Sequence, residues 1–192
     1  VIGVIMKKII FTLVITTIAM MCALPVIAQP QRASPHETIK AEIDGANISI
    51  AYGRPYTVKP GTTEVRKIWG GLVPWGKAWR LGADQSTTLI TDQPILIGET
   101  NVPAGTYRLY LVPMETGMSK LAINKKTGIW GIKGDQTVDE TEDLVRVDAK
   151  KEPMDKQLDQ LSMAIEKNPA GGGTIKIMWE KTQFSVPFTV KK

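Results

Sequence analysis

The sequence predicts an all-β fold, an antiparallel β-sandwich of about nine or ten short strands in a jelly-roll or Ig-like arrangement. After residue 29, apolar and polar residues alternate with a period of two, and turn-forming residues separate the short runs. No stripe of apolar residues at helical spacing interrupts this pattern. Strands that alternate in this way need water on one face, which favours antiparallel pairing.

The first two strands are the clearest. Ile39, Ala41 and Ile43 alternate with charged residues, and a second alternating run follows over 48–52. Asp44-Gly45 lies between them, a dipeptide that tolerates the positive φ angles of a two-residue hairpin turn. The spacing therefore predicts a hairpin over 39–52.

Further strands are expected where the alternation returns. These are residues 86–91, 95–97, 106–112, 120–124, 144–149 and 160–166. A final hairpin is expected over 175–190, with its turn at Lys181-Thr182. Because Pro187 has no N–H to donate, the last strand is predicted to lie at an edge or to pair on one side there.

The first 28 residues are interpreted as a signal peptide. Met6-Lys7-Lys8 forms a positive start, an apolar run covers 9–23, and Val26 and Ala28 occupy the −3 and −1 positions of a cleavage site. Cleavage before Gln29 would leave residues 29–192 as a single domain, periplasmic or extracellular, which meets the membrane only through the signal segment. The alternative is an uncleaved anchor, since 9–28 is long enough to span a bilayer.

Composition excludes several classes of function. The only cysteine, Cys22, lies in the signal segment, so the mature domain has no disulfide and no cysteine-based metal site; lipidation at Cys22 is disfavoured because large residues precede it. The single histidine, His36, excludes a multi-histidine zinc site. The basic residues are dispersed among acidic ones, which argues against nucleic acid as a partner. We expect no metal and no cofactor.

The regular pattern stops between residues 53 and 84, a stretch rich in glycine and proline that also holds three tryptophans. Long irregular segments within compact domains are usually functional or disordered. Three tryptophans argue against disorder. This stretch is therefore the candidate functional region.

Its motifs carry a family resemblance. Residues 68–74 read IWGGLVP and 79–84 read WRLGAD, with 102–107, VPAGTY, later in the chain. This arrangement resembles the family catalogued as domain of unknown function 2911, over about residues 34–190. The resemblance implies an exported bacterial protein and brings no activity or catalytic residues. The family motif often continues with Glu, where this chain has Gln85.

The residues predicted to bind a ligand are those that combine aromatic faces with a guanidinium and a carboxylate. Ring faces would stack on the apolar faces of a sugar, while Arg80 and Asp84 would bond hydroxyls; Arg80 could equally clamp a carboxylate. The alternative is structural, because large aromatics often anchor a loop onto a sandwich. The candidate residues are Trp69, Trp75, Trp79, Arg80, Asp84, Tyr52 and Arg54.

Two other features have weaker claims. The acidic residues over 135–143 could bind calcium, although a solvated charged loop is the favoured interpretation. His36 could serve as a general base, but no nucleophile motif accompanies it. The sequence therefore favours a non-catalytic domain that binds glycan or peptide. The alternatives are a hydrolase of envelope or dietary polymers, whose catalytic residues are unknown, and an assembly domain that pairs through an edge strand over 184–190.

Overall fold

A computed structural model describes residues 34–128 and 138–191, and residues 33–192 group into one compact unit. The predicted signal peptide, Cys22 and Asp135 lie outside the described residues. No helix in the described part of the chain is long and apolar enough to cross a bilayer.

Strands are the main regular structure of the described residues, which confirms the predicted all-β class. Among these residues, the one helical element is the short 3₁₀ turn η1, Glu140–Glu142. The nine strands pair antiparallel in the order β1-β2-β3-β6-β7-β8-β9-β4-β5. Their bounds are β1 His36–Ile43, β2 Ala46–Gly53, β3 Thr87–Thr91, β4 Ile95–Ile97, β5 Thr100–Val102, β6 Gly105–Val112, β7 Ser119–Asn124, β8 Asp143–Lys167 and β9 Gly173–Val190.

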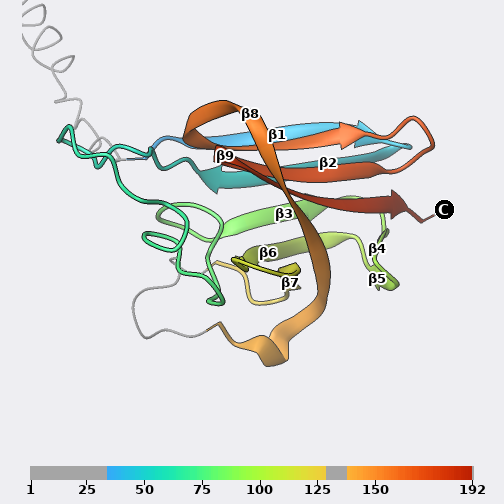
Figure 1. Cartoon of the computed structure of the whole chain (residues 1–192). Coiled ribbons are helices and arrows are strands. Elements are labelled where there is room, and N and C mark those ends of the chain that lie inside the picture. Colours follow the sequence, from blue (N-terminus) through green and yellow to red (C-terminus); the bar gives the residue numbers. More distant parts are fainter. Residues whose placement is uncertain (1–33, 129–137, 192) are drawn as a thin grey trace, which may run out of the picture. The chain divides into compact units, whose positions relative to one another are not determined.

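The sandwich arises because β8 belongs to both layers. Its first part, 143–149, pairs with β7, and its later part, 150–167, pairs with β9. Figure 1 shows β8, in orange, curving from the β7 side of the domain to the β9 side. Strands β1, β2, β3, β6 and β7 form one layer, and β9, β4 and β5 form the other.

One apolar core lies between the layers. The inward side chains of β2, β3 and β6, such as Ile50, Leu89 and Leu109, are fully buried. Ile175 and Trp179 of β9 belong to the same cluster from the other layer. Burial of apolar surface at about 25 cal/mol per Å² is the main favourable term for such a domain without disulfides.

The first hairpin is confirmed. Strands β1 and β2 pair from His36↔Gly53 to Ile43↔Ala46. Asp44 and Gly45 between them both have positive φ, 50° and 89°. This is the geometry of a two-residue turn whose twist matches that of the strands.

Two strands that the sequence predicts separately form a single strand in the structure. Residues 144–149 and 160–166 belong to the single strand β8, whose 25 residues include the polar stretch between them. The register of β8 against β9 shifts between Pro153 and Leu158 and again before Ser162. These bulges break the period of two and make the middle of β8 resemble a loop in the sequence.

The predicted turn at Lys181-Thr182 is absent, because β9 runs unbroken through it. Buried side chains fall on odd positions up to Trp179 and on even positions from Phe184 onward. Glu180 has φ 51°, so a bulge there shifts the phase by one residue. In the sequence, such a one-residue shift in the alternation looks the same as a turn between two strands, which explains the wrong prediction.

Strand β9 is not an edge strand, and the alternative prediction, pairing on one side near Pro187, is confirmed. Its residues 182–185 pair with β8 and its residues 188–190 pair with β4, on either side of Pro187. The pairing passes from one neighbour to the other around the residue that lacks an N–H. The two ends of the sheet are β1 and the three-residue strand β5.

Candidate functional site

The irregular segment between β2 and β3 is fixed to the domain by backbone hydrogen bonds. Trp79 exchanges both of its backbone hydrogen bonds with Leu111 of β6, at 2.7 and 2.9 Å. A tight loop forms at 68–73, where the N–H of Val73 donates to the carbonyl of Ile68. The segment therefore holds its side chains in fixed positions without being a strand.

Four tryptophans and Phe184 form one aromatic cluster. Trp69 is central: its ring lies 5.9 Å from Trp75 in a stacked arrangement and 5.8 Å from Trp79 edge to face. Trp79 in turn stacks on Trp179 of β9, with centroids 6.0 Å apart and planes at 22°. Offset and edge-to-face aromatic pairs contribute roughly 0.5–1.5 kcal/mol each beyond their buried area. The cluster anchors the irregular segment onto the β9 layer.

A groove of about 570 Å³ lies beside this cluster. Its volume is within the range of roughly 300–1,000 Å³ that is usual for small-molecule sites. Its wall combines aromatic, cationic and proline side chains. The described residues that line it are Ser34, Pro55, Pro60, Arg66, Leu72, Pro74, Lys77, Ala78, Trp79, Arg80, Gly82, Ala83, Asp84 and Trp179.

Trp179 has a buried polar atom without a partner. Its side chain is fully buried, and its indole Nε1 has no hydrogen-bond partner among the described residues. The same is true of Nε1 of Trp69 and Nε of Arg108. A buried donor without a partner costs about 1–3 kcal/mol.

The loop that follows Trp79 is held against the end of β2. A Cβ atom on Gly82 would lie 2.7 Å from the carbonyl oxygen of Gly53, and one on Gly53 would collide with the carbonyl of Ala83. Both positions therefore require glycine. The Thr87 hydroxyl donates to the carbonyl of Leu81 at 2.7 Å and closes the loop from its other end.

Two residues of this loop adopt a left-handed backbone. Leu81 has φ 59° and Asp84 has φ 61°, a conformation that costs a residue other than glycine roughly 1–3 kcal/mol. Leu81 is fully buried, and the carboxylate of Asp84 accepts a hydrogen bond from Nε2 of His36 at 3.0 Å. The strain is therefore maintained by core packing at one residue and by a side-chain pair at the other.

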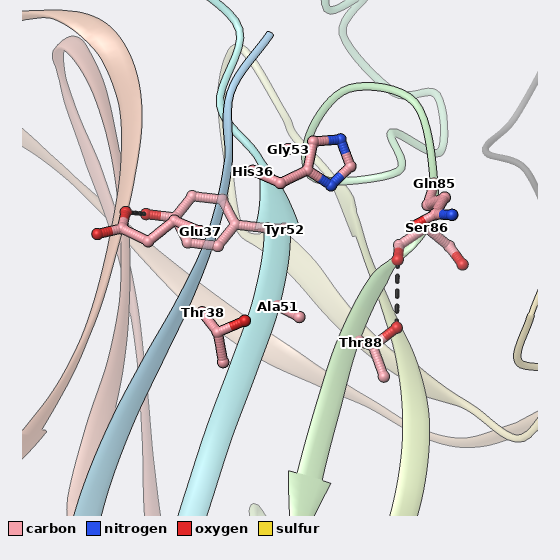
Figure 2. A pocket seen from close by; sticks show the side chains of 9 residues that line it. All are labelled: His36, Glu37, Thr38, Ala51, Tyr52, Gly53, Gln85, Ser86 and Thr88. Carbon is pink, nitrogen blue, oxygen red and sulfur yellow. Dashed lines mark hydrogen bonds between the residues drawn. The ribbon is translucent and has the colours of Figure 1, made fainter. Parts of the chain in front are cut away.

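His36 faces a second, smaller pocket of about 180 Å³. Figure 2 shows its ring between β2 and the loop that carries Gln85 and Ser86. Asp84 lines the groove and bonds a residue that lines this pocket, so the two hollows lie on either side of one loop. The sequence separates His36 from Asp84 by 48 residues and gave no sign of this pairing.

Tyr52 and Arg54 belong to a different arrangement. The Tyr52 hydroxyl donates to Glu37 at 2.7 Å and accepts from the N–H of Met163 at 2.9 Å. Arg54 bonds the carbonyl of Leu161 and the hydroxyl of Ser162, both at 3.0 Å, and pairs with Glu37 at 3.2 Å. Burial, followed by the hydrogen bond to Glu37, raises the pKa of Tyr52 well above its usual value. These residues tie β1 and β2 to β8.

The predicted binding residues thus divide into three sets. Trp79, Arg80 and Asp84 line the groove. Trp69 and Trp75 stand behind them in the aromatic cluster, where Lys151 Nζ lies 5.0 Å above the Trp75 ring. Tyr52 and Arg54 take part in the network on β8 and are not among the described residues that line the groove. That any of them contacts a ligand stays a prediction.

The carboxylates over 139–143 are bound to neighbouring side chains. Asp139 accepts from Thr141 and lies 3.8 Å from Lys126, and Glu140 pairs with Arg146 at 2.8 Å. Asp143 accepts from Tyr110 and Asn124. Among the described residues, no group of three or more histidine, cysteine or acidic side chains could hold a metal ion.

Sequence reasoning missed several residues that line the groove, among them Arg66, Lys77 and Trp179. Arg66 and Lys77 lie in the irregular segment itself, so their place in that segment was a usable signal. Trp179 was assigned to a strand face, and nothing local indicates that a residue 100 positions beyond Trp79 stacks on it. Only the fold brings the two rings together.

Comparison with known proteins gives a family and no function. No curated protein and no solved structure matches the chain. The model of the family described as "protein of unknown function (DUF2911)" matches residues 34–188, which include β1, the irregular segment, the groove and nearly all of β9. The chain therefore belongs to the DUF2911 family.

Proposed function

We propose that this protein is an exported, non-catalytic domain that binds a glycan or a peptide in the groove beside Trp79. The observation that carries the proposal is a groove of about 570 Å³ whose wall combines the ring of Trp79 with charged side chains. The Trp79 ring is half-buried and stacked on Trp179, and it supplies an apolar face to the groove. Arg80 and Asp84 add polar groups at the same wall.

The groove is suited to binding because its wall is pre-organised. Glycine contacts, the Thr87 hydrogen bond and the His36–Asp84 pair fix the loop 80–86 before any ligand arrives. A rigid wall reduces the ordering cost that binding would otherwise incur. Export is proposed from the charged start, the apolar run and the cleavage site of residues 1–28.

The test of binding is a fluorescence titration of the purified protein with glycan and peptide panels. Trp79→Phe is the informative variant, because Trp79 lines the groove, and Trp75→Phe is its matched control from the same cluster outside the groove. We expect a ligand to alter the emission of the wild type and of Trp75→Phe, and to bind Trp79→Phe at least several-fold more weakly. A ligand bound equally by all three proteins would place the site elsewhere.

The test of export is the N-terminus of the protein recovered from cells. We expect the mature chain to begin at Gln29 and to occur outside the cytoplasm. Full-length protein retained in the inner membrane would support an anchor and contradict cleavage.

A hydrolase is the second candidate function, and the His36–Asp84 pair favours it. A histidine held by a carboxylate at 3.0 Å beside a pocket is an arrangement that general-base catalysis uses. Turnover of envelope or dietary polymers by the wild type, abolished in His36→Ala, would establish it. Turnover that survives this substitution would exclude His36 as the base.

A further inference from the structure

The charges on the groove wall are unequal. Three cationic side chains, Arg66, Lys77 and Arg80, line it, against the single carboxylate of Asp84. Charge of one sign in a hollow with apolar walls concentrates the field there and raises the local concentration of the opposite charge. The groove is therefore electrostatically suited to an anion.

The single carboxylate is already engaged. Asp84 accepts the hydrogen bond from His36, which lies toward the second pocket. A carboxylate can only accept hydrogen bonds, so the shared proton belongs to the imidazole. This contact occupies one oxygen of the Asp84 carboxylate.

Two of the cationic side chains are oriented by backbone carbonyls. Nε of Arg66 donates to the carbonyl of Thr57 at 3.4 Å, and its Nη2 donates to the carbonyl of Tyr56. Nε of Arg80 donates to the carbonyl of Gly82 at 3.0 Å. These contacts help to hold the two guanidinium groups at the groove wall.

From this wall we infer that the ligand is an acidic glycan, a chain of sugars that carry carboxylates. This inference rests on the proposed binding function and names its ligand class. The Trp79 ring packs against the C–H face of a sugar, and Arg80 and Lys77 bind its carboxylates. A guanidinium forms two parallel hydrogen bonds with a carboxylate, which gives orientation as well as affinity.

The experiment compares three probes by calorimetry: an oligogalacturonate, a neutral gluco-oligosaccharide of the same length, and an oligoglutamate peptide. Each is titrated into wild type, Arg80→Gln, Lys77→Gln and the matched control Arg146→Gln. Arg146 is an arginine that pairs with Glu140 and Asp143 and is not among the described residues lining the groove. Circular dichroism of each variant shows whether it is folded.

We expect the oligogalacturonate to bind and the neutral sugar to bind at least tenfold more weakly. Arg80→Gln should weaken acidic binding tenfold or more, Lys77→Gln several-fold, and Arg146→Gln not at all. Raising the salt concentration from 20 to 200 mM should weaken binding of the acidic probe, because exposed charges are screened over about 10 Å at 0.1 M.

Other results would overturn the inference in different ways. Equal binding of acidic and neutral sugars, unchanged in Arg80→Gln, refutes the acidic class but leaves binding in the groove intact. Binding of oligoglutamate alone refutes the glycan class. Failure of all three probes, together with no hit in the fluorescence panels, refutes the proposed function itself.

Discussion

Arg54 and Arg80 mark the two ends of the same irregular segment, yet they serve different parts of the molecule. Arg54 directs its guanidinium into the domain, where Leu161 and Ser162 accept its hydrogen bonds and Glu37 forms an ion pair with it. Arg80 lies in the wall of the groove beside Trp79. The comparison teaches that residue type does not identify a binding residue. What matters is where the side chain lies, in the network on β8 or in the wall of the groove.

The largest expected effect on stability tests whether Trp179, which lines the groove, is also part of the hydrophobic core. Trp179→Ala removes a fully buried ring that contacts Trp69 and Trp79, and we expect it to lower the free energy of unfolding by roughly 3–5 kcal/mol. Urea denaturation followed by circular dichroism measures this. A loss below about 1 kcal/mol would show that the aromatic cluster contributes little to packing.

The second-largest effect on stability is expected at Arg54, which we expect to matter for folding and not for binding. Arg54→Ala removes the guanidinium that donates to the Leu161 carbonyl and pairs with Glu37, and it should destabilise the domain by about 1–3 kcal/mol. Ligand affinity in the groove should stay within twofold of wild type. A tenfold loss of affinity in a folded Arg54→Ala variant would assign this network to the site after all.

The third effect is a dependence of stability on alkaline pH. Because burial raises the pKa of Tyr52, the folded state keeps its proton where the unfolded state has lost it. Stability is therefore complete below the unfolded pKa of about 10 and falls above it by about 1.4 kcal/mol per pH unit.

Tyr52→Phe should reduce this alkaline slope, measured as the free energy of unfolding between pH 9 and pH 11. The slope will not vanish, because burial also raises the pKa of Tyr110, whose hydroxyl donates to Asp143. An unchanged slope in Tyr52→Phe would mean that Tyr52 titrates as it does in the unfolded chain.

The smallest effect on stability is expected at Arg80. Arg80→Gln removes a half-buried side chain at the groove wall, and we expect a change of at most about 1 kcal/mol in the free energy of unfolding. The same variant should lose acidic-glycan binding. A large loss of stability together with unchanged binding would show that Arg80, like Arg54, stabilises the fold and does not bind the ligand.

The parts of the fold that sequence predicted are those fixed by local rules. Asp44-Gly45 specifies its turn by backbone conformation alone, so the β1–β2 hairpin was predictable. The continuity of β8 was not, because its register shifts after Pro153 and its middle is polar and partly exposed. Bulges depend on the partner strand, which a single pattern does not contain.

The candidate site could likewise be predicted only where its residues are close together in the sequence. Trp79, Arg80 and Asp84 are close together in sequence, so the sequence alone was enough to identify this part of the groove wall. Trp179 reaches that wall from β9 and stacks on Trp79, while His36 of β1 contacts Asp84 from the second pocket, so both roles depend on tertiary contacts. Tyr52 and Arg54 were grouped with the wall because they are near it in sequence, although their side chains bond to β8.

The shared strand β8 has a consequence for how the domain opens. A strand of 25 residues at about 3.3 Å per residue is roughly 80 Å of chain, several times the length of an ordinary strand. Neither layer can detach without breaking the backbone ladder that continues into the other. Amide hydrogens of both layers should then exchange with solvent in one cooperative event, and their slowest exchange rates should coincide along the whole length of β8.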